Sequence, residues 1–144
     1  MAFDARGRLL VLGRIVAAAF AVFFGVGAGG HLCGRSVDPA SPFGRLVRWG
    51  AGGEPQEVML GVIYLALAVY LWRAVADPER HWLFIDFALA ANVAHSAVML
   101  FLSLVWADSI QHLWGDTLLT VLPTVVLALA WLPLRRSLAL HGAA

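Results

Sequence analysis

The chain of 144 residues is 61% apolar and only 13% charged, and its mean hydropathy is +0.81. Soluble domains carry charge on about a quarter of their residues, so this composition predicts a membrane protein. Arginine alone supplies the positive charge, since lysine is absent, and there is one cysteine, which argues against a basic nucleic-acid surface, an internal disulfide and a cysteine-based metal site.

Four apolar stretches are long enough to cross a hydrocarbon core about 30 Å thick. They lack the alternation of apolar and polar residues that is typical of barrel strands. Because lipid offers no hydrogen bonds to the backbone, each is predicted to be a helix. We expect one all-α domain over residues 1–144, an integral membrane four-helix bundle. The spans lie near residues 9–29, 57–75, 82–106 and 113–132, with a longer extracytoplasmic loop at 30–56.

The first span carries a small residue at every fourth position. These residues are Gly13, Ala17, Ala21, Gly25 and Gly29. In lipid such a face lets another helix come close, and it predicts packing against an internal neighbour, which we favour, or against a second protein. The apolar run is longer than the core of a secretory signal and contains Arg14, so we expect this helix to be retained.

The loop after the first span holds several prolines and glycines and cannot form one regular element. Within it, the segment PFGRLVRW places apolar residues against arginines. That spacing fits a short helix in the membrane interface, or equally an ordinary solvated loop.

Arginines indicate the side of the membrane on which each loop lies. They occur near the N-terminus, around the turn at Asp77-Pro78 and after the fourth span, and the positive-inside rule assigns these regions to the cytoplasm. We therefore expect both termini in the cytoplasm and a multi-pass protein of the bacterial inner membrane. Tryptophans are predicted at the outer interface (Trp49, Trp106, Trp114) and at the inner one (Trp72, Trp82, Trp131).

Two charged residues lie inside the spans near the cytoplasmic side. Arg14 of the first span and Asp86 of the third have similar depths, and a charge in the membrane needs a partner or water. We predict that they form a polar pair. The alternative is that Arg14 extends to the lipid headgroups while Asp86 lies in interfacial water.

Other polar residues gather in the outer half of the chain. The fourth span repeats one at every fourth position: His112, Asp116, Thr120 and Thr124. This spacing puts them on one face of a helix, which in a bundle would be the interior. Glu57 begins the second span, and His95 lies on the third. We expect one outward-facing pocket lined by Glu57, His95, His112 and Asp116.

Two imidazoles and two carboxylates suit a metal such as Zn, Fe or Mn, although helix spacings typical of metal sites, such as Glu-x-x-His, are absent. The same groups could transfer protons. A third interpretation is a hydrogen-bonded polar plug, in which Asp116 accepts from His112 or an indole and Glu57 caps its helix. His31 and His95 are also candidate axial ligands of a haem, for which their spacing gives no support.

Four segments resemble those of a family of small bacterial four-helix membrane proteins with only a domain-of-unknown-function label. They are EVMLGVIY, ADPERHWLFIDF, NVAHSAVM and HLWGD, within about the last two thirds of the chain. The resemblance implies the fold and the membrane location, and it implies no activity. The positions on the shared motifs are Glu57, His95, His112, Gly115 and Asp116.

Two kinds of function remain from the sequence. The first is an accessory or stabilising subunit of a larger bacterial membrane complex, which fits the small size and the small-residue face. The alternative is a metal- or cofactor-binding membrane protein, or a small membrane enzyme, that uses the outward-facing pocket. A transporter would need to dimerise. The expected partners are lipid and either other membrane subunits or a second copy of the chain, and not nucleic acid.

Overall fold

The computed structural model describes residues 5–35, 37–38, 40–42, 44–48, 54–106 and 110–141, without the side chains of His31, Glu54, Ala139 and His141. Four helices in this part are long and apolar enough to cross a membrane. They are α1 (Ala5–Leu32), α3 (Glu54–Ala74), α4 (Pro78–Val105) and α5 (Asp116–His141). Each includes most of one predicted span and extends beyond it at one or both ends, and no strand occurs in the described ranges. The predicted all-α fold with four spans is confirmed.

Two short elements lie in the loops. Helix α2 (Gly44–Val47) precedes α3, and the 3₁₀ turn η1 (Ile110–Trp114) precedes α5. The short helix is the one predicted from PFGRLVRW, although Phe43 and Trp49 of that segment lie outside the described residues.

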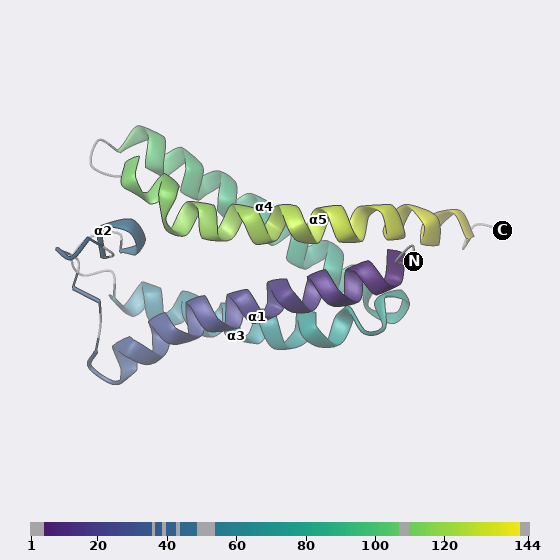
Figure 1. The fold of residues 1–144 in the computed structure, drawn as a ribbon, viewed down its shortest axis with the longest axis horizontal. Helices are drawn as coiled ribbons and strands as arrows, with labels where there is room; N and C mark the ends of the chain where they lie inside the picture. Colours follow the sequence, from purple (N-terminus) through teal and green to yellow (C-terminus); the bar gives the residue numbers. More distant parts are fainter. Residues whose placement is uncertain are drawn as a thin grey trace.

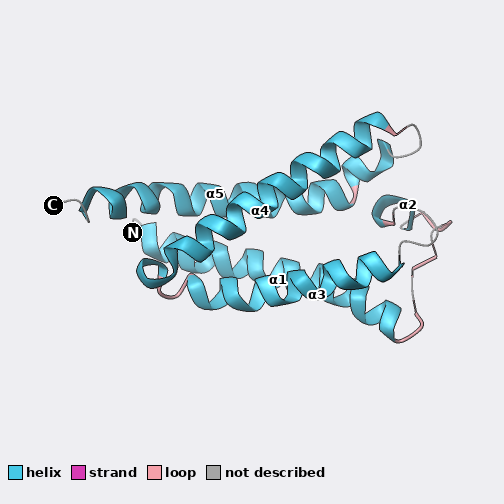
Figure 2. Ribbon diagram, turned by 180° about the vertical axis from the view of Figure 1, so that it is seen from behind, coloured by secondary structure: helices cyan, strands magenta, loops and turns pink. Residues whose placement is uncertain are grey.

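The four spans form two antiparallel pairs. α1 lies beside α3 and α4 beside α5, and further contacts join α1 to α5 and α3 to α4, so the spans close a ring (Figure 1). Seen from behind, the pairs diverge toward the end that holds α2 (Figure 2). We call this end, with α2 and η1, the loop end. The opposite end, with the first and last described residues, is the terminal end.

The small residues of α1 pack against α3 and its end. A Cβ atom on Gly13 would lie 2.5 Å from Val75, and one on Gly25 would lie 2.9 Å from Leu65. Gly29, the last member of the predicted face, has open space around it. In lipid, such close approach adds dispersion contacts that acyl chains do not supply. At Gly13 and Gly25, the small-residue face therefore serves an internal neighbour.

The apolar core lies where the four spans meet. Its largest fully buried side chains are Trp131, Phe20, Leu9, Leu71 and Ile85, contributed by all four spans. At the terminal end, the turn before α4 uses Asp77 as the helix N-cap, because its side chain accepts from the Arg80 backbone N–H at 3.4 Å. An exposed ion pair between Arg6 and Glu79 joins the start of α1 to the start of α4. This cap and this ion pair help to hold the helices together at the terminal end.

Candidate functional site

At the loop end, α2 is held against the HLWGD motif. Its first turn is capped by Ser41, whose Oγ accepts from the Gly44 N–H at 2.9 Å. The helix then brings the Leu46 backbone carbonyl onto Gly115, where a Cβ atom would overlap that oxygen. Because a backbone carbonyl cannot move aside as a flexible side chain can, this approach requires glycine. The motif residue Gly115 therefore fixes α2 over the start of α5.

The histidine and the aspartate of HLWGD form a buried pair. His112 Nδ1 lies 3.1 Å from Asp116 Oδ1, and both side chains are more than nine-tenths buried. The same carboxylate oxygen accepts from the Thr117 backbone N–H at 2.9 Å. Asp116 is the first residue of α5, where the positive end of the helix stabilises a carboxylate. The contact between His112 and Asp116 is the one that the polar-plug interpretation expected.

A second pair joins α2 to α3. Arg48 Nε lies 3.4 Å from the Glu57 carboxylate, and its terminal nitrogen donates to the Val37 carbonyl at 2.8 Å. The Arg48 side chain is only 4% exposed, so it depends on these contacts. Arg48 was not predicted as a site residue, because it is one of several arginines in the loop. The sequence did offer a signal for this pair. Glu57 stands at the start of a predicted span, and Arg48 belongs to the short amphipathic segment just before it.

Hydroxyl groups continue the polar interior below the HLWGD motif. Ser103 of α4 and Thr117 of α5 share a hydrogen bond of 3.1 Å between their side-chain oxygens. Thr120 donates to the Thr117 carbonyl at 2.9 Å, and Thr124 donates to the Thr120 carbonyl at 2.7 Å. All four are buried. The predicted interior orientation of the polar stripe on the fourth span is confirmed.

His95 lies apart from this region, about 15 Å along α4 from its loop end. Its ring centroid is 5.7 Å from that of Tyr64, which donates to Asn92 Oδ1 at 3.1 Å, and Asn92 in turn donates to the Ala88 carbonyl at 2.8 Å. His95 Nε2 and Ser96 Oγ are buried and have no hydrogen-bond partner in the described part of the chain. A polar ligand would gain hydrogen bonds at these two atoms.

The predicted metal set consists of Glu57, His95, His112 and Asp116. Glu57 pairs with Arg48, and Asp116 pairs with His112. His95 lies deeper, on α4. Within the described ranges, no three His, Cys, Asp or Glu side chains could hold a metal ion together. In place of one converging site there are two pairs and a separate imidazole. The haem interpretation also involves the side chain of His31, which lies outside the described residues.

At the terminal end, Asp86 binds α5. It accepts from the Trp131 indole Nε1 at 2.6 Å and from Arg135 Nε at 3.1 Å, and the Arg135 guanidinium lies 4.2 Å from the centroid of the Trp82 ring. Trp131 is fully buried, which corrects its predicted place at the lipid interface. The other described tryptophans are exposed, and Trp49 lies outside the described residues.

The predicted pair of Arg14 and Asp86 is not formed. The Asp86 carboxylate accepts its hydrogen bonds from α5. Arg14 instead packs over the Trp72 ring, with its Cζ 4.9 Å from the ring centroid. The cause is the order of helices around the ring, since α1 contacts α3 and α5 and stands diagonally opposite α4. Two charges at equal depth on diagonal helices are separated by the core.

Comparison with known proteins gives one match. Residues 31–137 match a family described as Family of unknown function (DUF6632), and this range includes all four of the segments EVMLGVIY, ADPERHWLFIDF, NVAHSAVM and HLWGD. No curated protein and no solved structure matches the chain. With the match extending from the last turn of α1 to the final turns of α5, the chain belongs to this family of unknown function, as its motifs predicted.

Proposed function

We propose that this protein is an accessory subunit of a larger complex in the bacterial inner membrane, and that α4 is the helix through which it binds its partner subunit. We place the terminal end in the cytoplasm. In support, most arginines lie at that end, and an excess of arginine marks cytoplasmic regions.

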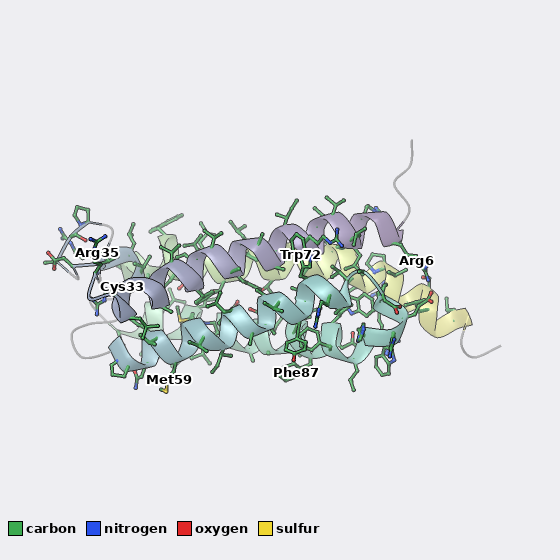
Figure 3. The ribbon with its side chains drawn as sticks, turned by 90° about the horizontal axis from the view of Figure 1, so that it is seen from below. Arg6, Cys33, Arg35, Met59, Trp72 and Phe87 are labelled. Carbon is green, nitrogen blue, oxygen red and sulfur yellow. The ribbon has the colours of Figure 1, made fainter. Side chains whose placement is uncertain are left out.

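The observation that carries the proposal is the division of α4 into two faces. One face is buried in the bundle and carries Ile85, Ala88, Asn92, Ser96 and Ser103. The opposite face is exposed and carries Phe87, Ala90, Ala94, Val98, Phe101 and Val105. Phe87 and Phe101 are 61% and 62% exposed, and Figure 3 shows Phe87 at the outer surface.

The exposed face has the shape that helices use to associate in lipid. Ala90 and Ala94 lie one turn apart on this face, between Phe87 and Phe101 in sequence, and we call this pair of small residues the notch. Exposed apolar residues alone are normal in a membrane, but small residues one turn apart let a second backbone approach closely. On α1, Gly13 and Gly25 are covered by side chains of α3 and of the residue that follows it, whereas Ala90 and Ala94 of α4 are exposed. A helix of another subunit fits this face.

The proposal is tested by substituting an alanine of the notch. Ala94→Leu adds bulk where the partner backbone would lie, and overpacking of about 1–3 kcal/mol corresponds to a roughly 5- to 150-fold loss of association. Ala66→Leu, on the exposed face of α3, is the matched control and should leave association unchanged. A photoreactive residue at Phe101 should give an adduct with another protein in native membranes. An adduct of only twice the chain mass, or equal association in both variants, would reject a foreign partner on α4.

A second candidate is a site-bearing protein that binds a cofactor or a small polar molecule between α3 and α4. The supporting observation is the pair of buried polar atoms without partners, His95 Nε2 and Ser96 Oγ. Removing such a ligand leaves two unsatisfied groups in the span, each costing about 1–3 kcal/mol. Elemental analysis and an absorption spectrum of the purified protein test this candidate. A bound metal or a Soret band that is lost in His95→Ala would favour it over the accessory role.

A further inference from the structure

A groove of about 400 Å³ opens toward the membrane between α1 and α3. Ala17, Ala18 and Ala21 of α1 form one wall, and Ala68 and Val69 of α3 form the other. Their side chains are short or apolar, so this stretch of the groove offers no hydrogen bond. It suits a hydrocarbon chain.

One end of the groove is cationic. Trp72 and Arg73 line it there, in the last turns of α3, and Figure 3 shows Trp72 on the half of the molecule nearer to Arg6 than to Cys33. Arg14, one turn before the alanines of α1, lies over the Trp72 ring with its Cζ 4.9 Å from the ring centroid. The groove therefore changes from apolar to positively charged toward the terminal end.

The residues that the structure describes do not neutralise these two arginines. Among the described residues, no ion pair joins Arg14 or Arg73 to a carboxylate, and the Arg14 Nε is buried without a hydrogen-bond partner. The nearby acids at this end have other partners, since Glu79 pairs with Arg6 and Asp86 with Arg135. Arg73 lines one end of the apolar groove and Arg14 lies beside it over Trp72, so the groove calls for an anionic ligand with an apolar tail.

We propose that this groove binds an anionic phospholipid of the leaflet at the terminal end. One acyl chain lies along the alanines of α1 and α3, and the phosphate lies between Arg14 and Arg73. Trp72 has the amphipathic ring that is typical of headgroup depth. A transmembrane helix is a poorer occupant, because its apolar surface would cover the arginines without neutralising them.

The experiment measures which lipid stays bound. The whole protein is reconstituted in nanodiscs with equal amounts of phosphatidylglycerol and phosphatidylcholine, extracted in mild detergent, and its retained lipids are measured by native mass spectrometry. Wild type should retain phosphatidylglycerol preferentially. Arg73→Gln should lower the ratio of phosphatidylglycerol to phosphatidylcholine about fivefold, the effect of one arginine near an anionic headgroup.

The controls separate a site from general charge. Arg136→Gln removes an exposed arginine at the same end, and it should keep the wild-type ratio. Ala18→Trp fills the groove and should lower the amount of both lipids, while Ala66→Trp on exposed α3 surface should not. Circular dichroism and gel filtration report folding, and Arg73→Gln tests the proposal even if Ala18→Trp does not fold.

Three results would overturn the lipid site. One is an equal ratio of the two lipids in wild type, and another is the same ratio in Arg73→Gln and Arg136→Gln. The third is an Ala18→Trp variant whose oligomeric mass changes while its lipid content does not, which would show that a second copy of the chain occupies the groove.

Discussion

The two ends of the bundle hold their charged residues in different ways. At the loop end, the side chains of Arg48, His112 and Asp116 are 4%, 4% and 7% exposed, and their pairs join the connecting segments to the starts of α3 and α5. At the terminal end, the Asp86 and Arg135 side chains are 34% and 30% exposed and lie among aromatic rings.

This difference has an energetic consequence. A buried pair has no water to replace a lost partner, so removing one member leaves the other unsatisfied. The pair of Asp86 and Arg135 is about one-third exposed, so a lost partner can be replaced by water or lipid phosphate. We therefore expect substitutions of similar chemistry to cost more at the loop end than at the terminal end.

The largest expected effect is that of Asp116→Ala. It removes a charge-assisted hydrogen bond to His112, worth about 2 kcal/mol, and an N-terminal contact to the Thr117 N–H, worth about 1 kcal/mol. The free energy of unfolding should fall by about 3 kcal/mol, measured by SDS titration in mixed micelles with circular dichroism. Thr120→Ala, one turn further along the same face, should cost less than half as much.

The next effect concerns the attachment of α2. Gly115→Ala places a methyl group on the Leu46 carbonyl, and such overpacking costs about 2 kcal/mol. The same titration should show the loss, and a cysteine crosslink between α2 and η1 should form more slowly. Gly29→Ala is the matched control, because nothing lies within 4 Å of its added Cβ. Equal stability of the two variants would mean that α2 is not held by this contact.

At the terminal end, Asp86→Ala should cost about 1.5 kcal/mol, about half the cost of Asp116→Ala. Arg135 keeps access to water and its contact with Trp82, so the loss arises mainly from the stranded indole N–H of Trp131. Adding Trp131→Phe removes that donor, and the double variant should therefore be more stable than the sum of the single losses predicts. An additive result would place the loss elsewhere.

The features that could be predicted from the sequence depend on hydropathy and residue spacing within single helices. Hydropathy predicted four spans, because every backbone group in lipid must be satisfied inside its own helix. A spacing of four predicted that His112 and Asp116 share a face, and their contact is local in sequence, across the junction between η1 and α5.

The contacts that the sequence analysis missed depend on which helices are neighbours. Arg14 and Asp86 were matched by depth, but depth does not reveal that α1 and α4 are diagonal or that α5 brings Arg135 to Asp86. Likewise, the partnership of Arg48 with Glu57 depends on where α2 rests, and Gly115 decides that from a distant part of the chain. The periodicity of a single segment indicates neither which helices are neighbours nor where α2 lies.

The smallest expected effect is that of Arg6→Gln, which removes the ion pair with Glu79. Both side chains are more than half exposed, at 56% and 53%, and exposed pairs contribute about 0.5 kcal/mol or less. The SDS titration should barely change, and added salt should remove even that difference, because screening weakens exposed pairs. The loss in the free energy of unfolding should then decrease from Asp116 to Asp86 to Arg6, in the order of their burial. A loss at Arg6 as large as that at Asp116 would show that partner identity, rather than exclusion from water, sets the cost of breaking a pair in this bundle.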